Sequence, residues 1–176
     1  MLRKIILILV CCAFWTSCEK DLTKRASSTS PILFQMDYVN YAWGYVHNGW
    51  FIDEKGHLYS YDDSSLDSWA EIENGHIHKD SLHMNFSQST KIGAQNLNTV
   101  LQYYKKALEM KGDSLSAPET IMADAGTQMF YAYEYEYSCN CYNAITIKRY
   151  GDITQTNTHA NAEQIYNWMK NLVIIF

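Results

Sequence analysis

Alternating residues near the C-terminal end of the chain predict two paired β-strands. In residues 127–138 every second position from Met129 to Tyr137 is apolar or aromatic, whereas Gln128, Glu134 and Glu136 lie on the other face. Side chains at a spacing of two lie on the same face of a strand. Residues 142–150 form a second predicted strand, and Cys139-Asn140-Cys141 connects the two. The pattern therefore predicts a C-terminal β-hairpin.

A three-stranded meander is predicted further towards the N-terminus. Residues 34–46 are long, aromatic and rich in residue types that favour strands. Asn48-Gly49 follows, which is the strongest short signal for a two-residue hairpin turn. A second turn is predicted at residues 53–56, before a third strand at residues 57–61.

Two stretches carry apolar residues at helical spacing. The first stripe consists of Leu97, Val100, Leu101, Tyr104 and Leu108, and the second consists of Ala162, Ile165, Met169 and Leu172. Gly112 ends the first predicted helix, the second starts near Thr158, and residues 80–86 are a candidate short helix. The apolar residues 173–176 are expected to dock on the sheet. Together these elements predict an α+β fold, in which an antiparallel sheet made of the meander and the C-terminal hairpin has two helices packed on one face.

The first 18 residues have the pattern of an export signal. Arg3 and Lys4 precede an apolar run of eleven residues at positions 5–15. A helix that spans a bilayer needs about 20 apolar residues, so this run is too short for a transmembrane segment. The small residues directly before Cys18 resemble the lipobox of bacterial lipoproteins. The resemblance implies that the Cys18 thiol carries fatty acyl chains such as palmitate and becomes the mature N-terminus.

The residues after Cys18 extend this resemblance. Glu19-Lys20-Asp21 is similar to the acidic export signal of Gram-negative lipoproteins displayed on the outer-membrane surface. Residues 22–30 are polar and rich in Ser and Thr, which is typical of a flexible tether. We therefore expect a signal peptide at 1–17, a lipidated cysteine and tether at 18–31 and a single α+β domain at 32–176. The expected location is the outer membrane or the cell surface, with the bilayer as a partner through the acylated N-terminus.

Composition narrows the range of functions. The chain has 176 residues, a hydrophobic fraction of 47% and a formal net charge of −5, which suits one domain with a buried core. An acidic chain without a basic stripe argues against nucleic acid as a partner. Three segments are similar to small uncharacterised surface lipoproteins, and that similarity implies no activity. They are Tyr41-Ala42-Trp43-Gly44-Tyr45, Trp50-Phe51-Ile52-Asp53 and the closing pattern of Gly151-Asp152, Asn157 and Ile165 to Trp168.

Two residue pairs have spacings that a metal site can use. Cys139-x-Cys141 and His76-x-His78 each place two side chains on one face of a strand, and His83 lies near the second pair. The pairs lie about 60 residues apart, whereas typical zinc sequences have finger-like spacing. The alternatives are a hairpin turn with two free cysteines, or a disulfide if the turn is tight enough. We expect no metal site and no cofactor.

Aromatic residues supply the candidate binding site. Tyr41, Trp43 and Tyr45 share one face of the predicted first strand, and the predicted turn at Asn48-Gly49 brings Trp50 to the same face. Aromatic rings bind the apolar faces of sugars and anchor protein partners. The alternative is that Trp43 and Trp50 are core residues, and the tyrosines between residues 131 and 137 allow the same two interpretations.

No local motif indicates catalysis. The chain lacks a P-loop and the GxSxG, HExxH, GxGxxG and EF-hand patterns, so no catalytic residue is assigned. The sequence favours a membrane-anchored, non-catalytic binding or accessory module with a protein or glycan ligand. The alternative is an inhibitor of a secreted or surface peptidase that inserts Asn48-Gly49 or Cys139-Asn140-Cys141 into a cleft. A small hydrolase is the third hypothesis.

Overall fold

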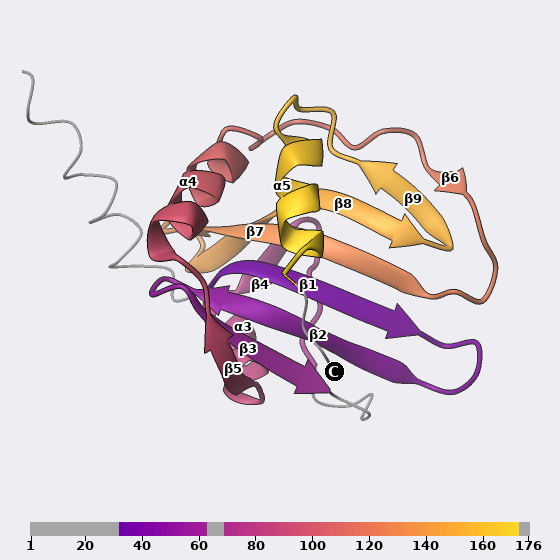
Figure 1. The fold of residues 1–176 in the computed structure, drawn as a ribbon, viewed down its shortest axis with the longest axis horizontal. Coiled ribbons are helices and arrows are strands. Elements are labelled where there is room, and N and C mark those ends of the chain that lie inside the picture. Colours follow the sequence, from indigo (N-terminus) through magenta and orange to yellow (C-terminus); the bar gives the residue numbers. More distant parts are fainter. Residues whose placement is uncertain (1–31, 63–68, 173–176) are drawn as a thin grey trace, which may run out of the picture.

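The computed structural model describes residues 32–62 and 69–172 (Figure 1). The predicted signal peptide, Cys18 and the tether lie outside the described residues, as do the predicted docking of residues 173–176 and part of the loop after the third strand.

The described residues contain nine strands in one antiparallel sheet and three helices. The strands are β1 (Ile32–Asn40), β2 (Val46–Asp53), β3 (His57–Asp62), β4 (His76–His78), β5 (Thr90–Ala94), β6 (Glu119–Thr120), β7 (Thr127–Glu136), β8 (Cys141–Gly151) and β9 (Ile153–Thr156). The helices are α3 (Lys79–Ser87), α4 (Leu97–Leu108) and α5 (Ala162–Lys170). The fold is α+β, as the pattern of the sequence predicts.

The strand order is β5-β3-β2-β1-β7-β8-β9-β6. β1 therefore lies between the meander and the C-terminal hairpin, with Met36 opposite Trp50 on β2 and opposite Phe130 on β7. The far edge of β8 is shared by two short strands. β4 pairs with residues 141–143 at one end, and β9 pairs with residues 148–149 at the other.

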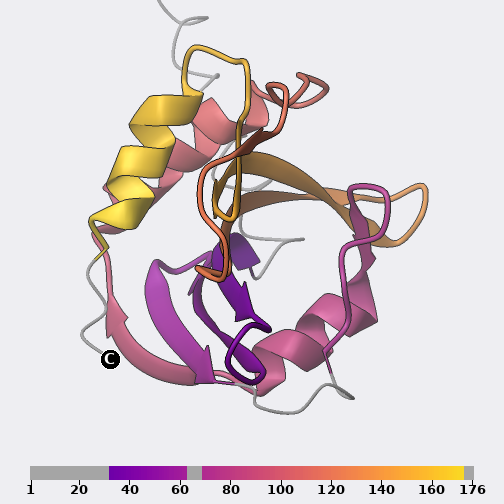
Figure 2. The ribbon, with the colours of Figure 1, turned by 90° about the vertical axis from the view of Figure 1, so that its right-hand side faces the viewer.

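Both faces of the sheet are buried, and each has its own core. Helices α4 and α5 cover one face, and α3 covers the other (Figure 2). The larger core includes Phe34, Trp50, Ile52, Phe130, Ile147, Val100 and Ile165, and the smaller one includes Phe51, Tyr61, Tyr133, Tyr142, Ile77 and Leu82. The two predicted helices share one face as expected. The third helix covers the opposite face. Successive positions of the central strands are apolar, so both faces of the sheet carry apolar side chains that need to be covered.

The predicted turn at Asn48-Gly49 is wrong. Both residues lie inside β2, where Asn48 is opposite Tyr38 and Gly49 is opposite Asp37. The chain reverses earlier, at residues 41–45, between β1 and β2. Gly49 is required here by packing, because a Cβ at this position would overlap the main-chain oxygen of Met36 and the ring of Tyr61. The glycine therefore marks a close approach of another side chain, which the turn rule cannot distinguish from a turn.

The other elements lie close to their predicted positions. In α4 the side chain of Asn96 caps the helix by accepting a hydrogen bond from the Thr99 main-chain N–H at 3.2 Å. α3 includes the candidate short helix, and α5 begins at Ala162, four residues after the predicted start. β7 and β8 form the predicted hairpin. Tyr131 and Tyr133 of β7 are buried in the smaller core under α3. Of the two interpretations of these tyrosines, core residues or binding surface, the structure therefore supports the first.

Candidate functional site

A pocket of about 650 Å³ opens on the α3 side of the sheet, a size typical of small-molecule sites. It lies over β1, β2, β7 and β8 and is bounded by residues 69–72 and by the β1–β2 connection. Its aromatic lining comes from Tyr41, Tyr45, Trp69, Tyr131 and Tyr133, and its charged lining comes from Asp37, His47, Glu71, Asp124, Arg149 and Asp152. Aromatic and charged side chains of both signs therefore meet in one pocket.

The floor of the pocket contains a buried carboxylate that two side chains share. Asp37 Oδ1 lies 2.7 Å from His47 Nε2 and accepts a hydrogen bond of 2.5 Å from the Tyr61 hydroxyl. The alternation of β1, β2 and β3 places the three side chains on the same face of adjacent strands. The two partners satisfy a carboxylate that would otherwise be costly to bury.

A second pair of side chains extends this network. Gln35 Nε2 donates to the Tyr61 hydroxyl at 2.9 Å, and the Tyr133 hydroxyl donates to Gln35 Oε1. The chain of donors runs from Tyr133 through Gln35 and Tyr61 and ends on Asp37. Burial, followed by the negative charge of Asp37, holds the pKa of Tyr61 well above its usual value. Burial also raises the pKa of Tyr133 well above that value, so both hydroxyls remain donors at neutral pH.

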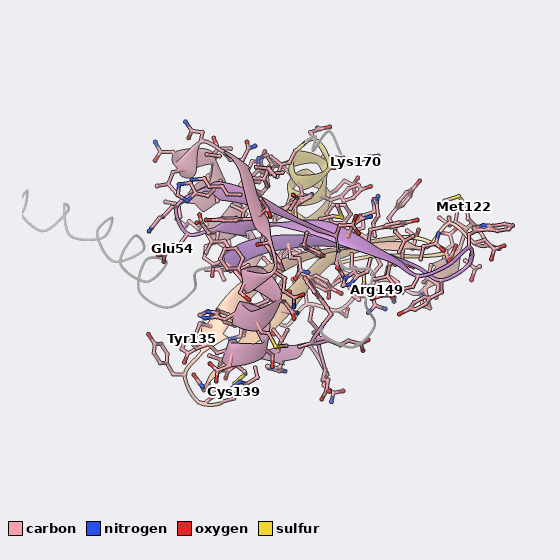
Figure 3. All side chains as sticks on the ribbon, turned by 90° about the horizontal axis from the view of Figure 1, so that it is seen from below. Glu54, Met122, Tyr135, Cys139, Arg149 and Lys170 are labelled. Atoms are coloured by element: carbon pink, nitrogen blue, oxygen red, sulfur yellow. A yellow bond between two sulfur atoms is a disulfide. The ribbon has the colours of Figure 1, made fainter. Side chains whose placement is uncertain are left out.

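Arg149 on β8 supplies the positive charge of the lining. Its Nε atom is buried and has no hydrogen-bond partner among the described residues. Burial raises the pKa of the adjacent Tyr131 to about 12, and the Arg149 charge opposes that rise. Figure 3 shows Arg149 on the opposite side of the sheet from Lys170 of α5. Arg149 thus places a positive charge in the lining of the pocket, and a guanidinium is suited to bind an oxygen atom of a ligand.

One wall of the pocket is held in place by α3. Asn85 of this helix accepts a hydrogen bond from the Ala70 N–H at 3.0 Å and donates to the Ala70 carbonyl at 2.8 Å. The clamp positions Trp69, whose ring stacks on Tyr61 at 4.4 Å and meets the edge of His47 at 4.6 Å. Trp69 therefore has a fixed position in the wall of the pocket. Its ring covers His47, which is only 2% exposed.

The mouth of the pocket is formed by the connection between β1 and β2. Tyr41 and Tyr45 face each other with their ring centroids 5.4 Å apart, and Tyr41 is 68% exposed. Asn40 secures the start of this connection, because its Oδ1 accepts from the Ala42 N–H at 2.8 Å. Two aromatic rings are thus presented to solvent at the entrance.

The structure brings together only part of the predicted aromatic site. Tyr41 and Tyr45 line the pocket, and Trp43 between them is 88% exposed. Trp50 is 2% exposed in the core under α4 and α5, on the opposite face of the sheet. Only the wrong turn at Asn48-Gly49 would place Trp50 on the same face as Tyr41, Trp43 and Tyr45.

Sequence reasoning missed the polar floor of the pocket. Gln35 and Asp37 alternate with large apolar residues in β1, and that alternation indicates a strand with one polar face. His47 and Arg149 carry no comparable local signal, because only the pairing of distant strands brings them to the pocket.

The cysteine and histidine pairs do meet, but the cysteines are bonded to each other. His78 of β4 is opposite Cys141 of β8, and Cys139 and Cys141 form a disulfide. His83 lies elsewhere, with Nε2 3.4 Å from the Tyr142 hydroxyl. In the described parts of the chain, no three His, Cys, Asp or Glu side chains are grouped so that they would hold a metal ion.

Comparison with known proteins finds no match to a family model, a curated protein or a solved structure. Within residues 32–62 and 69–172, every helix is too short or too polar to cross a bilayer.

Proposed function

We propose that this chain is an exported lipoprotein, anchored through Cys18 at the outer membrane or cell surface, whose folded part is a non-catalytic binding module. The proposed ligand is a glycan, held in the pocket over β1, β2, β7 and β8. The main support for this proposal is the composition of the pocket lining, which combines aromatic rings with side chains that donate and accept hydrogen bonds.

The charges of the lining support a neutral ligand that is rich in hydroxyl groups. A cationic ligand would face Arg149, and an anionic ligand would face Asp37, Asp124 and Asp152. Sugar hydroxyl groups both donate and accept, so they satisfy carboxylates and a guanidinium in the same pocket. The rings of Tyr41 and Tyr45 at the mouth would pack against the apolar face of a sugar ring.

The rigidity of the pocket also supports binding. Asp37 is held by His47 and Tyr61, and the wall at Trp69 is held by Asn85. Side chains that are already ordered lose little conformational entropy when a ligand binds. His47 lies behind Trp69, so its ring is a support for Asp37 and is not presented to a ligand.

Isothermal titration against a panel of neutral oligosaccharides tests the proposal. We expect saturable binding to at least one member of the panel and a loss of affinity of about tenfold or more in Tyr45→Ala and Arg149→Gln, since anchoring side chains each contribute about 1.4 kcal/mol or more. Tyr137→Ala is the matched control, because Tyr137 is an exposed tyrosine at a hairpin tip that does not line the pocket. Absence of binding across the panel, or equal binding by all three variants, would contradict the proposal.

The alternative function, inhibition of a peptidase, is favoured by one observation. The turn at Cys139-Asn140-Cys141, one of the two predicted inserting segments, is an exposed hairpin tip closed by a disulfide. Inhibition assays against co-exported peptidases, with Asn140→Trp as a variant that enlarges the tip, test this alternative. Inhibition by the native chain that the variant loses would support it.

A further inference from the structure

The tip of the β7–β8 hairpin carries a disulfide between residues only two positions apart. Cys139 and Cys141 have Cα atoms 5.2 Å apart and are joined through sulfur. Figure 3 shows Cys139 near Tyr135 at one end of the molecule, with Met122 at the other end. The disulfide lies outside the pocket, so the proposed ligand binding does not account for it.

Contacts other than the disulfide hold this turn. The Asn140 carbonyl accepts a hydrogen bond of 3.1 Å from the Lys79 N–H, at the start of α3. The Asn140 side chain accepts a second one of 2.7 Å from the Tyr135 hydroxyl. Glu136 and Cys141 are paired in the ladder between β7 and β8. None of these contacts involves a sulfur atom, so they remain available to hold the turn when the sulfur–sulfur bond is open.

A disulfide across so few residues is a weak structural constraint. In the chain-entropy model the stabilisation falls as the closed loop becomes shorter, and this loop is among the shortest that occur. The bond therefore adds little to a fold whose strands and helices are held by two cores. Its presence at an exposed tip requires another explanation.

The two sulfur atoms differ in their surroundings. Cys139 is exposed, whereas Cys141 is buried between its neighbours His78 on β4 and Glu136 on β7. An incoming thiolate reaches the exposed sulfur first, and access decides which sulfur is attacked. Beside the tip, Tyr137 is 74% exposed and meets the ring of Tyr135 at 4.9 Å, so an apolar surface adjoins the disulfide.

We propose that Cys139 and Cys141 form a thiol–disulfide exchange site that oxidises the two thiols of a peptide substrate. The first substrate thiolate attacks Cys139 Sγ, which forms a mixed disulfide and releases Cys141 as the thiolate. The second substrate thiolate then attacks the substrate sulfur of the mixed disulfide, which closes the substrate disulfide and releases Cys139. Two electrons pass from the substrate to the tip, and the two substrate protons are taken up by Cys139 and Cys141. One turn of this reaction needs no other oxidant.

The test uses the full chain and a synthetic peptide with two reduced cysteines, mixed without oxygen. Alkylation followed by peptide mapping separates Cys139 and Cys141 from the three other cysteines. We expect one peptide disulfide to form for each chain in which both tip cysteines become alkylated. The double variant Cys139→Ser/Cys141→Ser should keep its melting temperature within a few degrees and oxidise no peptide.

Two outcomes overturn the proposal. One is a tip disulfide that the peptide does not reduce until the protein is unfolded. The other is a double variant that no longer folds, which would make the disulfide a structural bond. The single variants test the direction of attack with the oxidised peptide. Cys141→Ser should form a mixed disulfide through Cys139 at least tenfold faster than Cys139→Ser forms one through Cys141, and equal rates would contradict the assignment of Cys139.

Discussion

Gly49 occupies the middle of β2 because a neighbouring tyrosine ring passes directly over it. Tyr61, on the adjacent strand, reaches across Gly49 to donate to Asp37 on β1. The hydrogen bond from Tyr61 to Asp37 thus requires a residue without a side chain on β2, the strand that lies between the two partners. At the residue scale, the pocket depends on one small residue as well as on the polar side chains that line it.

Substitution of this glycine should destabilise the protein. In Gly49→Ala the new Cβ would overlap the Met36 carbonyl oxygen and the Tyr61 ring, so β1 and β3 must shift. We expect a loss of about 3 kcal/mol in the free energy of unfolding, measured by urea denaturation. Gly93→Ala on β5 is the control, because a Cβ there has no atom within 4 Å and should change stability by less than about 0.5 kcal/mol. Equal losses in the two variants would contradict this account of Gly49.

Because several tyrosines are buried, we expect the free energy of unfolding to fall at alkaline pH. The folded protein keeps Tyr131 protonated, with its pKa raised to about 12 from 10.0, whereas the unfolded chain ionises near 10. The stabilisation is therefore complete below about pH 10 and is lost as the pH rises towards 12. The rise for Tyr131 alone corresponds to about 3 kcal/mol. Denaturation curves at pH 9 and pH 11.5, with tyrosinate absorbance as a second signal, should show this loss, and unchanged stability at pH 11.5 would contradict it.

At the scale of elements, much of the secondary structure could be predicted, including the meander, but the position of the turn between β1 and β2, and with it their register, could not. The stripe from Leu97 to Leu108 predicts α4 because its apolar residues follow a single period. The hairpin of β7 and β8 follows from alternation in the same way. The turn at residues 41–45 was missed because Tyr41 and Trp43 favour strands, while Gly49 imitates a turn signal. The pocket could not be predicted, because it forms only when strands far apart in the sequence pair, and no local sequence pattern indicates which strands pair.

The corrected position of β2 gives the two tryptophans opposite roles. Trp50 packs in the core under α4 and α5, whereas Trp43 is exposed at the β1–β2 connection. Trp50→Ala should cost about 3–5 kcal/mol of stability, because it removes a fully buried aromatic ring. Trp43→Ala should change the free energy of unfolding by less than about 0.5 kcal/mol. Thermal or urea unfolding of the two variants measures the contrast, and a comparable loss in both would show that the connection is packed against the core.

At the scale of the whole molecule, the proposed anchor and the pocket belong to different segments of the chain. Cys18 precedes the first described residue, Ile32, by fourteen positions, whereas the pocket is built from residues 35 to 153. Binding in the pocket should therefore not require the lipid.

Substitution of the lipobox cysteine tests the anchor. Cys18→Ala should abolish labelling with a radioactive fatty acid and release the chain from the membrane fraction, because the acyl chains provide the membrane affinity. Cys139→Ser/Cys141→Ser is the matched control and should remain labelled and in the membrane fraction. A Cys18→Ala chain that still carries label would show that the resemblance to the lipobox is misleading.

The most direct test of the proposed function is to map the bound glycan on the protein. Amide chemical shifts of the ¹⁵N-labelled chain, recorded while the tightest-binding neutral oligosaccharide of the panel is added, report which residues the sugar contacts. We expect shifts that cluster at residues 37–47, at Trp69 to Ile72 and around Tyr131 and Arg149, with the disulfide tip unchanged. Shifts centred on the tip or on the α4 and α5 face, or no shifts at millimolar sugar, would contradict it.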